Sequence, residues 1–231
     1  MPLVRTRGTI VECRFVTEEI KWFKIRLADP VDFHPGQYAN IRFLGESKYH
    51  AFSIASSSAQ TNELELVVKR EREFTTRLLM SPLGTELEVM APLGRFMAES
   101  DGDVIMIAGG VGVTPFLSTV RSARDKNLKD RQYWLFYSVR TRNAFFNEEE
   151  LRRLPSENSN IHLVLTMTRE QQPVWDGEYG HFSREMLLKH LASFENKTFY
   201  TCGPTKMAEE MVKVLVDAGV PKERVRMEAW G

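Results

Sequence analysis

The sequence predicts two domains, a small antiparallel β-barrel followed by an α/β domain with a doubly wound parallel sheet. Short runs of alternating apolar and polar residues, separated by turn residues, fill residues 7–98 and are typical of an antiparallel barrel. From residue 104 onward, apolar strand-like runs alternate with helix-like segments, which favours a parallel sheet covered by helices. A chain of 231 residues is long enough for two hydrophobic cores. We therefore expect domains at 1–98 and 99–231, separated by the acidic segment Glu99 to Asp103.

The composition narrows the classes of partner. Lys plus Arg and Asp plus Glu both number 31, so no global basic charge favours nucleic acid or an anionic membrane. No apolar run approaches the roughly 20 residues of a membrane-spanning helix, and the N-terminal residues do not form a signal peptide. Cys13 and Cys202 lie far apart without metal-ligand spacing. We expect no metal site, no disulfide framework and a location in the reducing cytoplasm.

Five strands are expected in the first domain, bounded by turn residues such as Asp29-Pro30. A short helix fits after Phe74, with Thr75 or Thr76 as its N-cap. The turn Pro92-Leu93-Gly94 is expected to close the domain. The five strands are Gly8 to Val16, Trp22 to Leu27, Gln37 to Phe43, Leu64 to Lys69 and Glu86 to Met90.

One barrel segment, His50 to Ser57, places an imidazole, an aromatic ring and a hydroxyl in close succession. In an extended strand His50 and Phe52 point to one face, and Ala51 and Ser53 to the other. Such a strand could set an aromatic ring beside a flat ligand and donate hydrogen bonds to it. The alternative is an ordinary strand that runs into a serine-rich turn.

The second domain is organised around Val104 to Leu117. Five apolar residues without alternation predict a buried strand of a parallel sheet. Gly109 and Gly110 then allow a sharp turn, and Pro115 suits the first turn of a helix, whose free N–H groups attract phosphate. The third glycine of the common dinucleotide motif is missing, so a plain glycine-rich turn is the alternative.

Strands and helices are expected to alternate through the rest of the chain, which argues for a parallel sheet with ligands at the carboxyl ends of its strands. Asn143 or Asn147 should lie near the start of the second helix, Pro155 beyond its end, and Ser183 should cap the third. The expected order is helix Phe116 to Lys126, strand Gln132 to Ser138, helix Phe145 to Leu154, strand Ile161 to Met167, loop Gly177 to Gly180, a helix through Leu191, strand Phe199 to Cys202, helix Thr205 to Ala218 and strand Val225 to Glu228.

Five motifs in this order resemble those of the ferredoxin–NADP reductase superfamily, and they span nearly the whole chain. They are Pro35-Gly36-Gln37-Tyr38, His50-Ala51-Phe52-Ser53, Leu83-Gly84-Thr85 with Pro92-Leu93-Gly94-Arg95-Phe96, Gly109-Gly110-Val111-Gly112-Val113-Thr114-Pro115, and Cys202-Gly203-Pro204. The resemblance implies a flavin-binding barrel followed by a nicotinamide-binding α/β domain.

At the flavin strand, most of the superfamily has an arginine and a tyrosine where this chain has His50 and Phe52. The row His50 to Ser53 is similar to the His-Pro-Phe-Thr motif of ferric reductases and NADPH oxidases, which bind FAD. Their glycine-glycine-aromatic-threonine motif resembles Arg72-Glu73-Phe74-Thr75, but both glycines are missing. The resemblance implies that Ala51, Phe52 and Ser53 meet the flavin, while His50, Thr75 and Thr76 hold its phosphates.

The same resemblance assigns roles in the second domain. The nucleotide would contact the glycine-rich turn and the turn after the Cys202 strand: Gly109, Gly110, Gly112, Thr114, Gly203 and Pro204. Cys202 would lie by the nicotinamide and Glu228 near the hydride path, so Cys202, Glu228 and Ser53 are the candidate catalytic residues. Trp230 would stack near the flavin. The alternatives are a buried structural cysteine and a solvated carboxylate on a terminal strand.

The choice of nicotinamide cofactor depends on charge. An acidic residue after the second strand would bind the ribose hydroxyl and repel a 2′-phosphate. Here that strand runs into Ser138-Val139-Arg140, and the next into Thr168-Arg169-Glu170, which resembles the Ser-Arg-Glu of NADP-using reductases. Because arginine and hydroxyl groups suit a phosphate, Ser138, Arg140 and Arg169 favour NADPH, with NADH possible.

These features lead to an FAD-dependent NAD(P)H reductase that passes electrons to an external acceptor. The candidate acceptors are a ferredoxin or flavodoxin, a haem or oxygenase component, a ferric chelate, a quinone or dioxygen. Two cysteines cannot supply the cysteine cluster of an internal iron–sulfur carrier. The alternative is a non-enzymatic electron-transfer or regulatory subunit in which flavin binding is weakened or lost.

Overall fold

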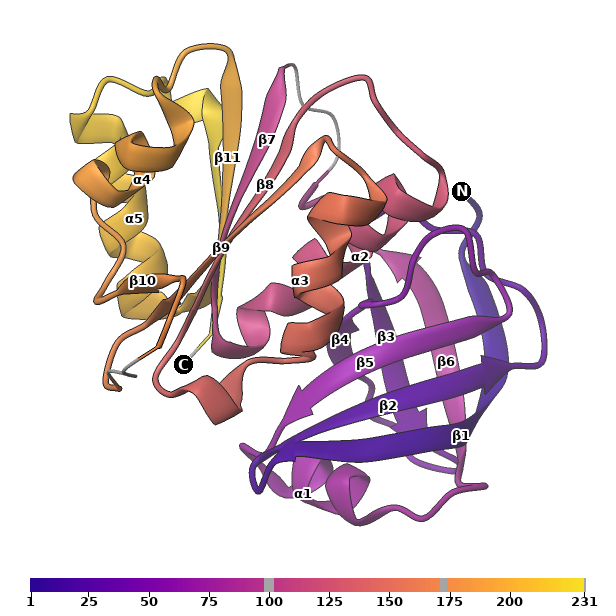
Figure 1. Ribbon diagram of the computed structural model, residues 1–231. Helices are drawn as coiled ribbons and strands as arrows, with labels where there is room; N and C mark the ends of the chain where they lie inside the picture. The colour runs from indigo at the N-terminus through magenta and orange to yellow at the C-terminus, as the bar shows by residue number, and fades with distance from the viewer. Residues whose placement is uncertain (98–101, 171–173, 231) are drawn as a thin grey trace. The chain divides into compact units, whose positions relative to one another are not determined.

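The computed structural model describes residues 1–97, 102–170 and 174–230 (Figure 1), apart from the side chain of Trp230. Its contacts divide the chain into two compact units. Unit 1 is Met1–Ala98 with Thr114–Lys126, and unit 2 is Glu99–Val113 with Asn127–Gly231. The expected boundary after residue 98 lies outside the described residues. The segment Thr114–Lys126 groups with the barrel although it follows the first strand of the α/β domain in sequence.

Unit 1 is built on a six-stranded antiparallel sheet in the order β4-β3-β6-β1-β2-β5. The backbone N–H of Ala55, just after β4, donates to the carbonyl of Glu65 in β5 over 2.8 Å and brings the two edge strands together. The predicted barrel is therefore confirmed. Its strands are β1 (Val4–Thr17), β2 (Ile20–Leu27), β3 (Tyr38–Phe43), β4 (His50–Ser53), β5 (Glu63–Lys69) and β6 (Glu86–Leu93).

The barrel core follows from the alternation along its strands, which points every second side chain inward. Ile10, Phe23 and Ile41 are fully buried in this way. The helix α1 (Glu73–Met80) adds Phe74, together with Leu78 one turn later, to the same core. Each buried aliphatic or aromatic side chain of this size contributes about 1.5–3 kcal/mol to folding.

Two local predictions in the barrel were wrong. The strand β6 continues through Pro92 and Leu93, because its register against β3 shifts there. An irregularity of this kind suits proline, which has no N–H for the ladder. The helix α1 begins before Thr75, with Arg72 as its N-cap, so neither Thr75 nor Thr76 is the cap. Thr75 instead satisfies backbone N–H groups from within the first turn.

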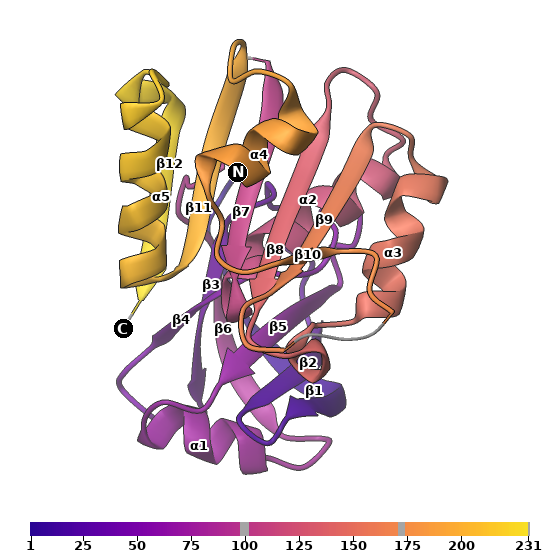
Figure 2. The same ribbon diagram turned by 60° about the vertical axis from the view of Figure 1, so that its left-hand side comes forward.

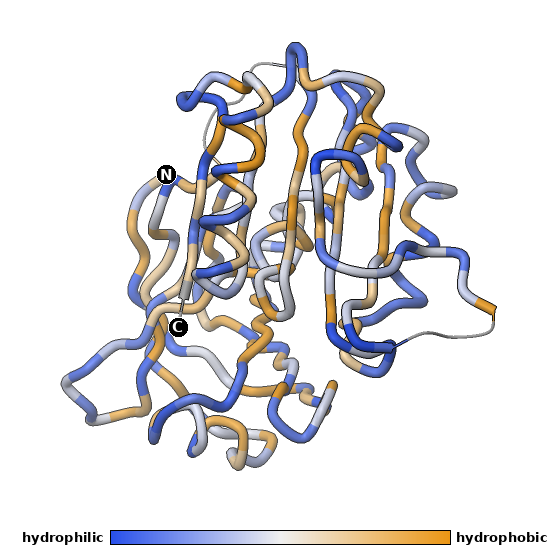
Figure 3. The backbone as a smooth tube through the Cα atoms, turned by 90° about the vertical axis from the view of Figure 1, so that its left-hand side faces the viewer, coloured by the Kyte–Doolittle hydropathy of each residue, from blue (hydrophilic) through white to orange (hydrophobic). Residues whose placement is uncertain are grey.

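Unit 2 is built on a parallel sheet in the order β10-β9-β8-β7-β11-β12. The direction of winding reverses between β7 and β11, which is where doubly wound folds bind ligands. Its central strands are apolar along their length (Figure 3). The strands are β7 (Asp103–Gly109), β8 (Tyr133–Val139), β9 (Ile161–Met167), β10 (Glu178–Tyr179), β11 (Lys197–Pro204) and β12 (Val225–Trp230).

Helices cover both faces of this sheet (Figure 2). The helix α3 (Glu148–Glu157) lies on one face, and α4 (Arg184–Leu191) and α5 (Thr205–Asp217) lie on the other. Leu187 of α4 and Met211 of α5 pack with Ile105, Phe136 and Phe199 of the strands. The doubly wound sheet is therefore confirmed. No helix within the described residues is long and apolar enough to cross a membrane.

The structure confirms one local prediction in unit 2 and corrects two others. The Ser183 hydroxyl does cap α4, accepting a hydrogen bond from the N–H of Met186 over 3.2 Å. The helix α3 starts only at Glu148, after the N-cap Asn147, and contains Pro155 in its last turn instead of ending before it. The expected loop at Gly177 to Gly180 includes the short strand β10, which pairs with the end of β9.

The helix α2 (Thr114–Asp125) carries a buried ion pair to the barrel. Arg121 donates from Nη1 to Glu65 Oε2 over 2.8 Å and to the carbonyl of Ala55 over 2.9 Å. The same Glu65 oxygen accepts from the indole N–H of Trp22 over 2.8 Å. The exposed fractions of the two charged side chains are only 8% for Arg121 and 14% for Glu65. Removing either partner would leave the other charge buried and uncompensated.

We therefore expect Arg121→Ala to lower the free energy of unfolding of unit 1 by about 3–5 kcal/mol. Urea unfolding followed by circular dichroism measures the loss. Arg153→Ala is the matched control, because Arg153 pairs with Glu149 at side-chain exposures of 59% and 84%. An exposed pair of that kind contributes about 0–1 kcal/mol. Equal losses of unfolding free energy in the two variants would show that the buried pair stabilises the protein no more than the exposed pair does.

Candidate functional site

The strand β4 carries the predicted flavin-binding residues. Phe52 pairs with Ala39 of β3 and Ser53 with Tyr38, while His50 pairs with Ile41. His50, Phe52 and Ser53 are half-buried and Ala51 is exposed. Among the described residues the Ser53 hydroxyl makes no hydrogen bond, so it is available to a ligand. Phe52 packs against the barrel core.

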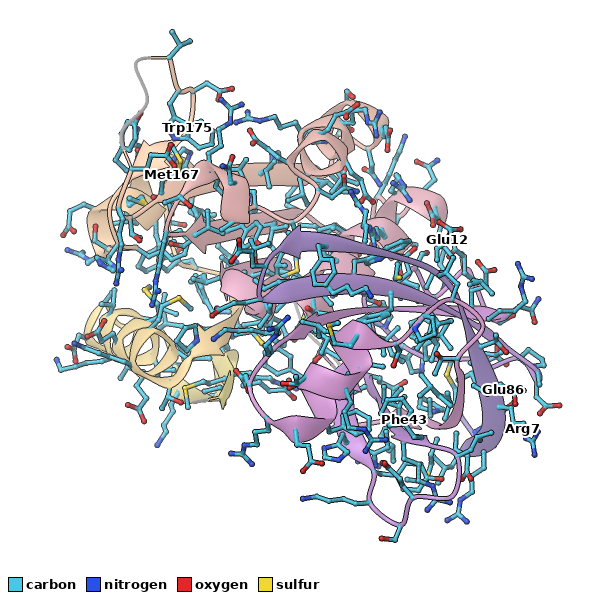
Figure 4. The ribbon with its side chains drawn as sticks, turned by 90° about the horizontal axis from the view of Figure 1, so that it is seen from below. Arg7, Glu12, Phe43, Glu86, Met167 and Trp175 are labelled. Atoms are coloured by element: carbon cyan, nitrogen blue, oxygen red, sulfur yellow. The ribbon has the colours of Figure 1, made fainter. Side chains whose placement is uncertain are left out.

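Phe74 of α1 gathers three rings around itself. The His50 ring stacks on Phe74 with centroids 3.9 Å apart and an interplanar angle of 14°. Phe52 lies 6.1 Å from Phe74, and Phe43, labelled in Figure 4, lies 5.3 Å from it. Burial lowers the pKa of His50, and the nearby Lys48 charge lowers it further. The imidazole is therefore neutral at physiological pH, with one face covered by Phe74.

The Thr75 hydroxyl is committed to the start of α1. It accepts from the backbone N–H groups of Glu71 and Arg72, over 2.9 and 3.0 Å, and donates to the carbonyl of Arg72 over 2.9 Å. These three bonds use its proton and both lone pairs. Thr76 is exposed, and its backbone N–H donates to the carbonyl of Arg72. The sequence reasoning, which gave these threonines to the flavin phosphates, did not foresee this local network.

The predicted nucleotide turn follows β7 at the reversal point of the sheet. Gly109 and Gly203 lie so close that a Cβ on Gly203 would come within 3.2 Å of the Gly109 Cα and N atoms. A Cβ on Gly109 would lie 2.5 Å from the Met207 sulfur. Gly110 has φ of +55°, in the region that favours glycine. Gly112 lies in the following turn of 3-10 helix (Gly110–Val113), and Thr114 begins α2.

Cys202 and Glu228 lie side by side on neighbouring strands. They are paired in the register of β11 with β12, and in the same register Pro204 pairs with Trp230. Cys202 is 1% exposed. Burial raises the pKa of the Cys202 thiol, and the Glu228 carboxylate raises it further. Burial also raises the pKa of Glu228. The structure therefore brings the two candidate residues together and keeps the thiol protonated.

The candidate 2′-phosphate residues lie at the carboxyl ends of β8 and β9. The backbone N–H of Arg169 donates to the carbonyl of Arg140 over 2.9 Å, which holds the two arginines on adjacent strands. Both are exposed, and within the described residues neither guanidinium makes an ion pair. Ser138 is 8% exposed and precedes them on β8. These three residues are thus brought to one edge of the sheet.

A neighbouring cluster was missed by the sequence reasoning. Arg142 and Arg152 both bind Glu148 of α3, and both lie over the ring of Trp175, at 5.4 and 5.0 Å from its centroid. The Trp175 indole N–H donates to the carbonyl of Glu178 in β10 over 3.1 Å, and Trp175 is labelled in Figure 4. The spacing of Glu148 and Arg152, four residues apart on a helix, predicts an ion pair that sequence reasoning could have recognised. No sequence pattern indicates where Trp175 lies. Because these arginines are committed to Glu148, Arg140 and Arg169 are the better candidates for a ligand.

Family comparisons agree with this geometry. Residues 7–97 match the family described as oxidoreductase FAD-binding domain, and residues 106–213 match the oxidoreductase NAD-binding domain. The two matches coincide with the barrel and with most of the parallel sheet. The chain thus combines an oxidoreductase FAD-binding domain with an oxidoreductase NAD-binding domain, as the resemblance to the ferredoxin–NADP reductase superfamily predicts. The superfamily's FAD and nicotinamide cofactors, predicted from the motifs, are confirmed.

Individual proteins are similar to this chain over nearly its full length. The ferredoxin–NAD(P)(+) reductase component of the naphthalene 1,2-dioxygenase system of Pseudomonas putida is 26% identical, covering 97% of this chain and 68% of its own length. The reductase component of phenol 2-monooxygenase of Pseudomonas sp. strain CF600 is 27% identical, covering 99% and 66%. The chain thus spans about two thirds of these relatives. A cytochrome P450 reductase structure from Amycolatopsis shares the fold, with a TM-score of 0.85, 22% identity and coverage of 99% and 70%.

The residues of the superfamily site fit FAD unequally at its two ends. Phe52 and Ser53 offer a half-buried aromatic ring and a free hydroxyl, which suit the flavin ring. At the other end, His50 offers one N–H donor without a charge, and the Thr75 hydroxyl is committed to α1. The individual site residues remain predictions.

The state of the two thiols can be checked directly. Since the thiolate is the form that reacts, we expect iodoacetamide at pH 8 to alkylate the half-buried Cys13 and to spare Cys202 in the folded protein. Mass spectrometry of peptides locates the label. In urea both cysteines should react. Labelling of Cys202 at the rate of Cys13 in the folded protein would refute a buried, protonated thiol.

Proposed function

We propose that this chain is an FAD-dependent NAD(P)H reductase that hands electrons to an external acceptor. The observation that carries the proposal is that Cys202, Glu228 and the Gly109–Gly203 approach gather where the winding of the sheet reverses, in a chain that also carries a flavin-binding barrel. Two relatives that are similar over nearly the whole chain are named reductase components of oxygenase systems. An oxygenase component or a small carrier protein is therefore the acceptor class we favour.

The chain's own residues have definable tasks in this proposal. When bound, the flavin supplies the hydride-accepting chemistry. Ser53 would donate a hydrogen bond to its ring, and Phe52 would pack against it. The Cys202 thiol would lie at the nicotinamide, where a neutral, polarisable group supports developing charge without acting as a nucleophile. Gly110 and Gly112 would allow the nucleotide to approach the backbone closely.

The cellular setting and the competing function follow from the same residues. The cysteines Cys13 and Cys202 are both free, which supports the cytoplasm as the location we propose. The committed Thr75 hydroxyl favours a second candidate, a subunit that has lost flavin and has no reductase activity. The two functions differ in whether NAD(P)H is oxidised once flavin is supplied.

We expect the purified chain, supplied with FAD, to oxidise NADPH or NADH and to reduce ferricyanide. Cys202→Ala should slow reduction of the bound flavin about tenfold to thousandfold, equivalent to about 1–4 kcal/mol of transition-state stabilisation. Stopped-flow loss of flavin absorbance measures this step, and flavin content should stay unchanged.

Cys13→Ala is the matched control, because Cys13 lies in the barrel strand β1, outside the proposed site. It should leave the rate unchanged. If the flavin bound to Cys202→Ala is reduced at the rate of the parent chain, Cys202 has a purely structural role. A parent chain that binds flavin yet oxidises neither nucleotide would rule out the reductase function.

For the nucleotide, we propose a preference for NADPH that depends on Arg169. Removing its guanidinium should cost about 1.5–3 kcal/mol of binding to the 2′-phosphate, or roughly ten- to hundredfold in affinity. Steady-state kcat/KM for both nucleotides is the measurement, and NADH should hardly respond because it lacks that phosphate. Higher salt should narrow the NADPH advantage, since exposed ion pairs are screened.

Arg153→Ala serves as the control here, because it removes an exposed arginine from α3 that pairs with Glu149. It should change neither nucleotide's kcat/KM. The preference is wrong if the parent chain already favours NADH, or if Arg169→Ala weakens both nucleotides equally.

A further inference from the structure

The turn that follows β4 is held by side chains from a distant part of the sequence. It consists of residues 55–58, which begin two positions after Ser53, and all four are buried. Arg121 and Ser122 of α2, and Lys126 directly after this helix, donate to the turn or accept from it. Polar groups as buried as these need hydrogen-bond partners, and the α2 segment supplies several of them.

Arg121 holds the first residue of this turn. Its Nη1 donates to the carbonyl of Ala55 over 2.9 Å and to the Glu65 carboxylate over 2.8 Å. The backbone N–H of Ala55 donates to the carbonyl of the same Glu65 over 2.8 Å. Ala55 is therefore fixed at its N–H by a strand of the barrel and at its carbonyl by α2.

Ser122 and Lys126 hold the last residue of the turn. Ser122 Oγ accepts from the backbone N–H of Ser58 over 2.8 Å, and the Lys126 ammonium donates to the Ser58 hydroxyl over 2.8 Å. The N–H of Lys126 donates to the Ser122 carbonyl, which continues the helical turn and brings both side chains to one face. The Ser58–Ser122 bond is buried, so without the Ser122 hydroxyl the Ser58 N–H would lose its partner.

The buried charge pair in this arrangement contributes direction more than stability. Taking a guanidinium and a carboxylate out of water costs free energy that can exceed their attraction, and apolar side chains of similar size often stabilise a core equally well. A guanidinium differs from such side chains because its donors are fixed in one plane. Arg121 therefore ties the Ala55 carbonyl to Glu65 in one geometry.

The position of this turn determines the position of Ser53. Only Ile54 separates Ser53 from Ala55. The Ile54 N–H donates to the carbonyl of Gln37 over 3.0 Å, and its side chain is fully buried in the barrel core. Because Ile54 is held at its backbone and at its side chain, it cannot absorb a shift of the turn. A displacement of Ala55 would therefore displace the Ser53 hydroxyl.

We propose that Arg121 and Ser122 are positioning residues of the flavin site: through the turn 55–58 they set where the Ser53 hydroxyl meets the flavin ring. The inference rests on the proposed reductase function, in which Ser53 donates a hydrogen bond to that ring. Neither residue touches the flavin in this role, and both act through Ser53.

The Arg121 test replaces both members of the ion pair, because Arg121→Ala alone would leave the Glu65 charge buried without a partner. Arg121→Met combined with Glu65→Gln removes both charges and keeps a side-chain oxygen for the Trp22 indole N–H. Titration of flavin fluorescence without nicotinamide gives the dissociation constant of FAD on the full chain. We expect the paired variant to weaken FAD roughly three- to tenfold, the size of one neutral hydrogen bond.

A double-mutant cycle with Ser53→Ala separates positioning from stability. Ser53→Ala alone should weaken FAD by a similar factor, and adding it to the paired variant should weaken FAD little further, because the displaced hydroxyl has already lost its bond. Independent residues give factors that multiply. Multiplied factors, a Ser53→Ala variant that binds FAD like the parent, or a paired variant that does so, would each overturn the proposal.

Ser122→Ala tests the other end of the turn and decides the proposal if the paired variant fails to fold. It should weaken FAD severalfold and show the same lack of additivity with Ser53→Ala. Thr6→Val is the matched control, because the buried Thr6 hydroxyl accepts from the backbone N–H of Asp29 over 3.0 Å in the same barrel. Both variants should lower the free energy of unfolding in urea by similar amounts. Equal weakening of FAD by both would mean that affinity follows stability, against a positioning role.

The two hypotheses fail in different ways. Coupled losses of FAD affinity in a chain that oxidises neither NADPH nor NADH would refute the reductase function and leave the positioning role standing. NAD(P)H oxidation by a chain whose variants bind FAD like the parent would refute the positioning role and leave the reductase standing. A chain that binds no flavin at all would refute both.

Discussion

The close approach of β7 and β11 is the constraint on which the nicotinamide half depends. At that point Gly109 and Gly203 face each other with no room for a Cβ, and Met207 fills the remaining space. Only glycine lets two parallel strands and the following turn come this near without a shift of backbone. Backbone groups and the Cys202 thiol therefore lie close together at the carboxyl ends of these two strands. This is the point at which the strand order of the doubly wound sheet reverses.

In the barrel, Phe74 has the corresponding organising role, because one ring meets Phe43, His50 and Phe52. Its position is fixed by α1, whose start is fixed in turn by the Thr75 hydroxyl. The same contacts that order this corner use up the donors and cover the imidazole. Stability of the corner and recognition of a phosphate thus compete for the same few groups.

Much of the fold could be predicted because hydrophobic periodicity is a strong signal. The strand Ile161–Met167 was predicted to the residue, and Ser183 was correctly expected as an N-cap. The ends of helices and the hydrogen bonds of individual side chains were harder to predict. Pro155 was expected outside α3, although a helix can lose one hydrogen bond in its last turn and continue. The Thr75 hydroxyl binds the N–H groups of Glu71 and Arg72 because of the backbone conformation of those two residues just before α1. No sequence pattern predicts that conformation.

The distribution of charge separates the two halves of the candidate site. Arg140 and Arg169 are exposed charges at the edge of the sheet, while Cys202 beside Glu228 is buried and protonated. A group that loses a hydride develops charge, and a neutral polarisable neighbour accommodates that change with little reorganisation. Fixed charge is better placed at the rim, where it would select a phosphate in the proposed function. The nicotinamide half follows this arrangement, and the flavin half, with a neutral His50 in the place of a cation, does not.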